Sequence, residues 1–387
     1  MAFVTCIAPV NIAVIKYWGK RNEELILPLN DSISCTLSTE QMCARTTVVA
    51  STRYNENKFW LNGKEENSNS PRLINCIKDI KEKAEKVESE ASKLNVHICS
   101  ENNFPTAAGL ASSAAGYAAL IAGLASLYGV KGDISAIARK GSGSACRSVL
   151  GGWVRWHKGE LADGSDSIAT EIAPASHWPE MRILILVVND ARKKHSSTSG
   201  MKQSVKTSAF LKYRVEKIVP ERTDQMVKAI KTKDFETFAK LTMQDSNQFH
   251  STCLDTYPPI HYMNDTSHAI CDLVHAYNNI KGCNKVAYTF DAGPNACLYM
   301  LEQDVPEFFT LIMNVFPSDL DSVEYVKGMP LKVSVLSEQL KELADNYRHN
   351  TGALKYIIHT CVGDGPQVLR EPHEHLLDKD GFPCKHS

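Results

Sequence analysis

The sequence predicts an α+β fold organised in two lobes. The chain has 387 residues, of which 43% are hydrophobic and 22% charged, a globular composition with enough length for two moderate domains. Strand-like segments dominate its first part, and the later segments mix helices and strands without the regular alternation of a parallel α/β sheet. We expect the first lobe over residues 1–180 and the second lobe over residues 181–387.

The first part of the chain shows the period-two alternation and the short apolar runs of β-strands. Asn-Gly at residues 62–63 is a strong signal for a tight hairpin. Ser70 and Pro71 then predict the start of a long helix, whose apolar face extends from Leu73 to Ala91. The predicted strands around this helix cover residues 3–7, 11–15, 32–39, 45–51 and 96–100.

Residues 104–116, FPTAAGLASSAAG, lie between a predicted strand and a helix predicted over residues 117–130. The first backbone N–H groups of a helix have no internal partner and the helix dipole favours negative charge, so a phosphate can bind at such a junction. Glycine and serine at a helix start are also ordinary turn and capping residues, and the spacing alone favours neither role. The stretch is not a Walker A loop, because no lysine follows its second glycine in the required position.

The second part of the chain is predicted to mix helices and strands irregularly. Strands over residues 286–290 and 297–301 flank a turn that begins with Asp291. An aspartate at such a position usually supports the turn backbone. The remaining predicted elements are helices over residues 134–140, 208–249 and 267–277, strands over residues 153–158, 182–189 and 353–361, and a polar tail after residue 370.

Three polar segments allow either a ligand site or a solvated surface. KYWGKR at residues 16–21 combines cations and rings that suit an anionic ligand, but an exposed strand end uses the same residues for solubility. GSGSACRSVLGG at residues 141–152 requires a backbone loop, yet it lacks the third glycine of a dinucleotide fingerprint and follows a helix. DARKKHSSTSG at residues 190–200 places cations beside hydroxyls, and its His195 has no evident partner for catalysis.

Charge and cysteine content argue against several classes of protein. A net charge of −1, with basic and acidic residues interspersed, gives no electrostatic footprint for nucleic acid or a membrane surface, so we expect small-molecule partners. The 12 cysteines include no Cys-x-x-Cys pair and are interpreted as reduced thiols. The first residues do not read as a secretory signal, and the uncharged stretch between Glu101 and Lys131 is too rich in Ala and Gly for a membrane helix. We therefore expect a cytoplasmic protein.

Three segments together resemble the three motifs of the small-molecule (GHMP) kinase superfamily: APVNIAVIKYWGK at residues 8–20, PTAAGLASSAA at residues 105–115 and YTFDAGPNA at residues 288–296. Within it the chain is similar to the mevalonate diphosphate decarboxylases, and the likeness extends over RKGSGSACRS, DSNQFH and PPIHYMNDTS. The resemblance implies a GHMP-kinase-like fold. Its N-terminal nucleotide-binding lobe would be similar to the second domain of ribosomal protein S5, its C-terminal lobe would be an α/β sandwich with the catalytic aspartate, and the active site would lie in the cleft.

The resemblance also implies an activity, the ATP-dependent decarboxylation of (R)-mevalonate 5-diphosphate to isopentenyl diphosphate in isoprenoid and sterol precursor synthesis. Phosphorylation turns the tertiary 3-hydroxyl into a good leaving group, and the carboxylate electrons form the new double bond as phosphate and carbon dioxide depart. ATP would be the co-substrate, with Mg²⁺ between nucleotide and protein. The family further implies a homodimer.

The resemblance assigns roles by position. Asp291 would be the general base or an orienting acceptor for the 3-hydroxyl, Lys16 would keep Asp291 ionised, and Arg147 would bind the substrate carboxylate through both arms. Contacts with the substrate and its diphosphate are implied for Tyr17, Trp18, Gly19, Lys20, Arg72, Ser142, Gly143, Ser144, Ala145, Cys146, Arg147, Ser197 and Thr198. The ATP phosphates would lie on Ala107, Ala108, Gly109, Leu110, Ala111, Ser112 and Ser113. No side chain is assigned as a metal ligand.

One departure separates the chain from the related kinases. Their loop at the position of GSGSACR typically carries an aspartate as catalytic base, whereas this chain has Arg147, which cannot act as a base near neutral pH. The alternative functions are a kinase that phosphorylates a related mevalonate derivative without decarboxylating it, and a non-catalytic binding protein. Release of carbon dioxide would distinguish the decarboxylase from both.

Overall fold

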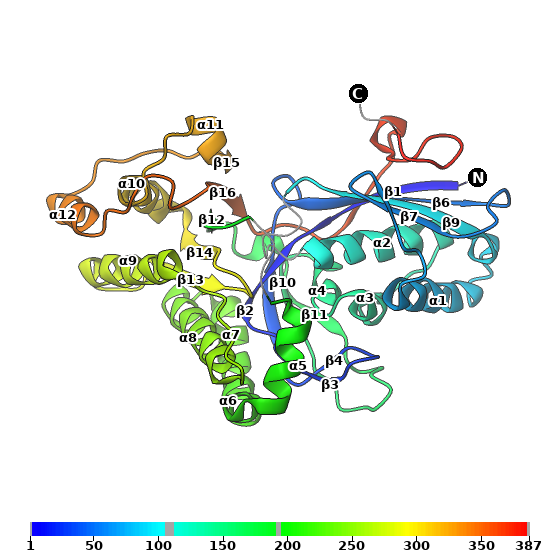
Figure 1. Ribbon diagram of the computed structural model, residues 1–387, viewed down its shortest axis with the longest axis horizontal. Coiled ribbons are helices and arrows are strands. Elements are labelled where there is room, and N and C mark those ends of the chain that lie inside the picture. Colours follow the sequence, from blue (N-terminus) through cyan, green and yellow to red (C-terminus); the bar gives the residue numbers. More distant parts are fainter. Residues whose placement is uncertain (1, 105–111, 191–194, 385–387) are drawn as a thin grey trace.

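The computed structural model describes residues 2–104, 112–190 and 195–384. Figure 1 shows two lobes, one with the blue and cyan N-terminal elements and the other with the yellow and orange elements of the second half. The red C-terminal segment returns to the first lobe and lies near the N-terminus. Both ends of the chain therefore belong spatially to the same lobe.

The first lobe is built on a six-stranded sheet with the order β17-β1-β6-β9-β7-β8. Helices cover one face, where Val48 and Ile98 of the sheet pack with Leu124 of a helix. The other face buries Leu376 and Leu377 of the C-terminal segment. The strands are β1 (Ala2–Pro9), β6 (Cys43–Ser51), β7 (Lys58–Leu61), β8 (Lys64–Glu66), β9 (Asn95–Asn102) and β17 (Gln367–Leu369), and the helices are α1 (Pro71–Glu85), α2 (Ser112–Tyr128) and α3 (Ser135–Gly141).

A four-stranded antiparallel sheet, with the order β11-β10-β5-β2, lies between the lobes. Its residues Ile12, Ile33 and Trp153 share one buried apolar cluster with the strands of the second lobe, so the lobes have a continuous core. This region contains β2 (Asn11–Ile15), β5 (Ser32–Thr36), β10 (Trp153–Trp156), β11 (Ala169–Ala173), the hairpin β3 (Lys20–Asn22) and β4 (Leu27–Pro28), and the short helix α4 (Ala145–Ser148).

The second lobe contains a five-stranded sheet with the order β13-β14-β12-β16-β15, antiparallel except for the last pair. Its strands are β12 (Met181–Val187), β13 (Val286–Phe290), β14 (Ala296–Leu301), β15 (Val326–Gly328) and β16 (Tyr356–Cys361). Its helices are α5 (Ser197–Thr207), α6 (Ala209–Tyr213), the π-helical segment η3 (Arg214–Ile218), α7 (Val219–Thr232), α8 (Phe235–Asp255), α9 (Asp265–Lys281), α10 (Val305–Val315), α11 (Ser322–Tyr325) and α12 (Glu338–Asn346). Short 3₁₀ turns occur at Glu90–Lys93, Ala175–His177, Glu302–Asp304 and Pro372–Glu374.

The structure confirms the α+β architecture and most predicted elements, including the tight hairpin, in which Asn62 and Gly63 both have positive φ. The helix predicted to extend to Ala91 is too long. Helix α1 ends at Glu85, because Glu88 adopts a left-handed backbone conformation and the N–H of Ser89 returns to the carbonyl of Ala84.

Two further regions add detail to the sequence-based expectation. The helices predicted over residues 208–249 are present, with a π-helical segment joining α6 to α7 and a break at Lys233 before α8, but Phe210 of the predicted apolar face is 54% exposed. The polar tail after residue 370 packs against the first sheet through Leu376 and Leu377. All 12 cysteines are free thiols, as predicted. In the described ranges, no helix is long and apolar enough to cross a bilayer.

Candidate active site

An ion pair between the two lobes marks the centre of the site. Lys16 follows the end of β2, and Asp291 follows the end of β13. The Lys16 Nζ lies 2.5 Å from Asp291 Oδ1, and Lys16 is buried whereas about a third of the aspartate side chain (30%) is exposed. The structure thus brings together two of the three residues to which catalytic roles were assigned, and the exposed part of the carboxylate is available to a ligand.

Hydrogen bonds to helix α8 and within the turn itself hold the turn that carries Asp291. The N–H of Phe290 donates to Ser246 Oγ at 3.0 Å, and the N–H of Gly293 donates to the carbonyl of Asp291 at 2.7 Å. His250 lies behind the turn, 3.4 Å from the carbonyl of Phe290. Burial, assisted by the charge of Lys16, lowers the pKa of His250 to about 3, so this imidazole is neutral at physiological pH.

Arg147 is a buried cation surrounded by neutral acceptors. It lies in α4, its Nε donates to Asn11 Oδ1 at 3.2 Å and to Ser34 Oγ at 3.0 Å, and its Nη1 donates to Ser32 Oγ at 2.6 Å. Desolvation by burial lowers its pKa, and the negative charge of Asp291 acts in the opposite direction. Within the described part of the chain, no carboxylate forms an ion pair with Arg147, an arrangement that favours an incoming anion.

Tyr17 lies beside this cation. Its ring packs edge-on against Trp156, with centroids 4.7 Å apart, and its buried hydroxyl has no hydrogen-bond partner among the described residues. Burial raises the pKa of Tyr17, while Arg147 and Arg72 act against this shift. Gly143 leaves room for the ring, because a Cβ there would lie 2.8 Å from Tyr17 Cε1. A buried hydroxyl that lacks a partner and is affected by the charges of two arginines indicates a position that an anionic ligand completes.

The two lobes also approach each other at helix α5. Arg72 Nη2 of α1 lies 3.5 Å from Thr198 Oγ1, near the N-terminus of α5. Ser196 caps this helix, and Ser197 is its first residue. The structure therefore places the predicted residues Arg72, Ser197 and Thr198 in one region.

Other predicted contact residues have structural partners. The indole N–H of Trp18 donates to Ser204 Oγ at 2.9 Å, and Lys20 Nζ lies 2.7 Å from Glu23 Oε2. The Cys146 side chain is fully buried, and burial raises the pKa of its thiol to about 12. The remaining members of this group are Gly19, which has a positive φ of 89°, Ser142, which is buried, Ser144, whose carbonyl accepts from Asn11, and Ala145, which is fully buried.

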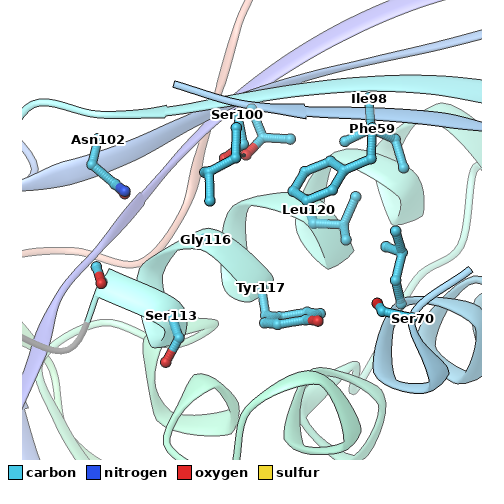
Figure 2. Close-up of a pocket in the computed structure, with 13 residues that line it drawn as sticks. Phe59, Ser70, Ile98, Ser100, Asn102, Ser113, Gly116, Tyr117 and Leu120 are labelled. Carbon is cyan, nitrogen blue, oxygen red and sulfur yellow. Dashed lines mark hydrogen bonds between the residues drawn. The ribbon is translucent and has the colours of Figure 1, made fainter. Parts of the chain in front are cut away.

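The start of α2 lies next to a cavity of about 230 Å³. Figure 2 shows Ser113, Gly116, Tyr117 and Leu120 of α2 below the sheet residue Phe59. Ser113 Oγ is 3.2 Å from Ser142 Oγ, which connects this helix start to the short segment between α3 and α4. The predicted phosphate-contact residues 107–111 lie outside the described residues. The cavity is lined by Thr46, Phe59, Leu61, Ser70, Leu73, Ile98, Ser100, Asn102, Ser112, Ser113, Gly116, Tyr117 and Leu120.

Sequence reasoning missed the residues that hold the main chain of Lys16. Its N–H donates to Asp245 Oδ2 at 2.7 Å, and its carbonyl accepts from Arg214 Nη2 at 3.1 Å and Asn30 Nδ2 at 3.0 Å. Asp245 begins the segment DSNQFH, which formed part of the family resemblance, so its position carried a signal without a role. Arg214 lies in no motif that we identified.

Comparison with known proteins gives consistent matches. The family model described as the diphosphomevalonate decarboxylase-like N-terminal domain matches residues 8–169, and the one described as the mevalonate 5-diphosphate decarboxylase C-terminal domain matches residues 183–369. The diphosphomevalonate decarboxylase of Rattus norvegicus is 54% identical over 98% of this chain and 96% of its own length. That of Bos taurus is 52% identical over 98% and 97%.

Solved structures agree. Mevalonate diphosphate decarboxylase from Trypanosoma brucei has a TM-score of 0.90 and 40% identity, covering 97% of this chain and all of its own. A structure on mevalonate diphosphate mediated ATP binding in the enzyme from Enterococcus faecalis has a TM-score of 0.72 and 31% identity, with 95% and 99% covered. A structure with the same TM-score, identity and coverage is described as a complex with MVAPP, AMPPCP and magnesium.

Proposed function

Because the chain belongs to the mevalonate diphosphate decarboxylase family, we propose that its cleft catalyses the ATP-dependent decarboxylation of (R)-mevalonate 5-diphosphate to isopentenyl diphosphate. The other products are ADP, phosphate and carbon dioxide, so the enzyme is a carboxy-lyase of isoprenoid precursor synthesis. The observation that carries the proposal is the Lys16–Asp291 pair, 2.5 Å long, whose aspartate acts electrostatically on the buried cation Arg147.

These three residues divide the reacting groups of the substrate among themselves. Asp291 would accept a hydrogen bond from the 3-hydroxyl, directing its oxygen toward the γ-phosphate of ATP. Lys16 keeps that carboxylate oriented and stabilises negative charge that develops beside it. Arg147 would bind the substrate carboxylate and release it from a water-poor site once it becomes neutral carbon dioxide.

The carbon–carbon bond breaks after the hydroxyl has been phosphorylated. The bond between carbon 3 and the phosphorylated oxygen then breaks, and phosphate leaves. The bond that joins the carboxylate carbon to its neighbour also breaks, and its electron pair forms the double bond of isopentenyl diphosphate as carbon dioxide departs. A loose phosphoryl transfer needs little assistance from a base, so alignment by Asp291 is its main contribution. The related-kinase alternative is disfavoured because Arg147 occupies the loop in which those kinases carry an aspartate.

The diphosphate of the substrate would be bound by the cationic and hydroxyl groups around Tyr17. The orphaned Tyr17 hydroxyl supports this placement, and Arg72 and Thr198 supply a cation and a hydroxyl from opposite lobes. The further contact residues that we propose are Trp18, Gly19, Lys20, Ser142, Gly143, Ser144, Ala145, Cys146 and Ser197.

ATP would place its phosphates at the start of α2 and its nucleoside in the adjoining cavity. Ser112 and Ser113 line that cavity at the N-terminal end of α2, where backbone N–H groups favour phosphate oxygens. Among the described residues, no group of three or more His, Cys, Asp or Glu side chains forms a metal site. Mg²⁺ would be held largely by the phosphates of the bound nucleotide and by water molecules, which is how this ion commonly binds.

Four further features are proposed, the lobe boundary and the homodimer from the family resemblance, and the location and the ligand class from the composition. The proposed boundary between the lobes falls at residues 180 and 181, although strand β17 and the segment after it return to the first lobe, and the proposed assembly is a homodimer. A cytoplasmic location and exclusively small-molecule ligands are consistent with the near-neutral net charge.

The test follows ADP and carbon dioxide together, using ATP, Mg²⁺ and mevalonate 5-diphosphate labelled with carbon-14 in its carboxyl group. We expect equal amounts of both products, and a loss of at least about 100-fold in kcat for Asp291→Asn. Asp319→Asn, an exchange at an exposed site, is the matched control and should retain full activity. ADP without labelled carbon dioxide would identify a kinase, and binding without either product would identify a non-catalytic protein.

A further inference from the structure

The main chain of Lys16 is held by a buried ion pair that the reaction itself does not use. Asp245 Oδ2 accepts the Lys16 N–H at 2.7 Å, and Arg214 Nη2 donates to the Lys16 carbonyl at 3.1 Å. Both hydrogen-bonding groups of the Lys16 backbone are therefore engaged by one charged pair. A lysine held at both its N–H and its carbonyl has a fixed backbone position from which its side chain extends toward Asp291.

The pair itself has the geometry of a two-pronged clamp. Arg214 Nη1 lies 2.8 Å from Asp245 Oδ1, and Arg214 Nη2 lies 2.9 Å from Asp245 Oδ2, with both side chains fully buried. A buried ion pair contributes little net stability compared with apolar residues of similar size. Its presence directly under a catalytic lysine therefore points to geometric specification.

Arg214 reaches this position from an unusual backbone. It is the first residue of the π-helical segment η3, between α6 and α7. π-helical turns are rare and frequently occur at functional sites. Here the turn accompanies a change from Tyr213, which is 59% exposed, to Arg214, which is fully buried under Lys16.

Asp245 also has a neighbour that holds the other half of the catalytic pair. Ser246, the next residue of α8, accepts the N–H of Phe290 at 3.0 Å, and Phe290 directly precedes Asp291. Two consecutive residues of one helix thus fix the backbone of Lys16 and the backbone next to Asp291. Lys16 follows a strand of the sheet between the lobes, and Asp291 follows a strand of the second lobe.

We propose that Asp245 and Arg214 are positioning residues that, together with Ser246, set the distance between Lys16 and Asp291. The dipeptide Asp245-Ser246 acts as a spacer between β2 and β13, and Arg214 locks Asp245 in the orientation that accepts the Lys16 N–H. The inference rests on the proposed function for its effect on the reaction, but its geometric part concerns the Lys16–Asp291 spacing alone.

The main test uses Arg214→Lys, which keeps a positive charge beside Asp245 but cannot bond to both Asp245 and the Lys16 carbonyl with a planar fork. We expect kcat to fall about 100-fold, as for a displacement of about 1 Å, with both KM values within about threefold of wild type. On a Lys16→Met background the same exchange should cost no further activity, because its effect is exerted through Lys16. The proposal would be overturned if Arg214→Lys reduced the activity of the Lys16→Met variant by the same factor as that of the wild type. It would also be overturned if the loss of kcat/KM came from a higher KM and not from a lower kcat.

Two companion variants guard against a simple folding defect. Ser246→Ala leaves the buried N–H of Phe290 without its acceptor, so a modest fall in the thermal unfolding midpoint is expected; kcat, measured well below that midpoint, should fall in the same non-additive way. Arg222→Lys is the matched control, since Arg222 contacts Asp245 Oδ1 at 3.4 Å and Gln248 Oε1 at 3.0 Å. Among its hydrogen bonds to the described residues, none goes to Lys16, so we expect a change of less than about threefold.

A crystal structure of Arg214→Lys separates this inference from the proposed function. The Lys16 Nζ to Asp291 Oδ1 distance is expected to increase by about 1 Å from its wild-type value of 2.5 Å. An unchanged distance would overturn the positioning role whatever the activity. An inactive wild-type enzyme would instead contradict the proposed reaction, while an increased distance in the variant would still support the spacer.

Discussion

At the residue scale, the site contains polar groups that are buried before any ligand arrives. The Tyr17 hydroxyl has no partner among the described residues, and Arg147 is surrounded by neutral oxygens. Leaving such groups incompletely paired costs free energy in the unliganded protein. A ligand that supplies carboxylate and diphosphate oxygens removes that cost, so part of the stability is exchanged for affinity.

The Tyr17→Phe substitution tests directly whether the unpaired hydroxyl lowers stability and raises affinity. Removing an unpaired buried hydroxyl should leave the free energy of unfolding unchanged or raise it by about 1 kcal/mol, while KM for mevalonate 5-diphosphate rises about 10-fold. Chemical denaturation and steady-state kinetics give the two quantities. Tyr213→Phe, at a position that is 59% exposed, is the control and should change neither. Reduced stability with an unchanged KM would show that the hydroxyl is structural.

The Lys16–Asp291 pair was predictable only as a combination. Asp291 by itself reads as an ordinary turn aspartate, and Lys16 reads as a strand-end cation, until both are placed on family motifs. The structure then joins them at 2.5 Å across 275 positions of sequence. Arg214 was not predictable, because its role depends on a π-helical turn that has no recognised sequence signal.

At the element scale, α2 serves two purposes with small residues. One side packs against the sheet, where a Cβ at Gly123 would lie 3.5 Å from Val48, and another side borders the cavity near Gly116. Small residues allow both the sheet and a ligand to approach the helix closely. The same small residues made this stretch ambiguous between an anion site and a helix cap.

Gly116→Leu should obstruct the nucleotide without harming the helix. A Cβ at Gly116 would meet no atom within 4 Å, and leucine favours a helix over glycine by up to about 1 kcal/mol. We expect KM for ATP to rise at least about 10-fold, while KM for mevalonate 5-diphosphate and the thermal midpoint are maintained. Gly123→Ala on the sheet side is the matched control. An unchanged KM for ATP would place the nucleoside elsewhere.

The C-terminal segment shows where element prediction from sequence fails. Strand β17 pairs with β1, and the N–H of Leu376 donates to Thr47 Oγ1 at 2.9 Å. Its apolar residues are few and widely spaced, so no periodic pattern identifies it. By contrast, β12, which is apolar except for Arg182, and the alternating β9 were predictable because each carries a clear sequence pattern of a strand.

Leu376→Ala measures how much this segment stabilises the first lobe. Leu376 is 2% exposed and packs in a cluster with Val49 and Trp60, so truncation should cost about 2–4 kcal/mol of unfolding free energy. Leu161→Ala, at a position that is 53% exposed, is the matched control and should cost less than about 0.5 kcal/mol. Urea denaturation followed by fluorescence gives both values, and equal losses would mean that the segment does not stabilise the lobe.

At the scale of the whole molecule, burial determines which histidines of the folded chain resist protonation. The pKa values of His97, His157, His250 and His359 are all lowered, in each case chiefly by desolvation. Below an unfolded-state pKa of about 6.5, the unfolded chain binds protons that the native chain refuses. The stabilising contribution of these histidines is therefore complete above pH 6.5 and decreases as the pH falls toward the folded-state values.

His250 allows the sign and size of this effect to be measured at one position. With a folded-state pKa of about 3, it should lower the free energy of unfolding by about 2 kcal/mol between pH 7 and pH 5. The charges next to it are Lys16, which opposes protonation, and Asp291, which favours it, so the ion pair must be intact in the comparison. His250→Gln should flatten the dependence of the unfolding free energy on pH over this interval, whereas the exposed control His373→Gln should leave it unchanged. A wild-type protein that gains stability on acidification to pH 5, or a His250→Gln variant with the full wild-type slope, would show that His250 is not held neutral by the fold.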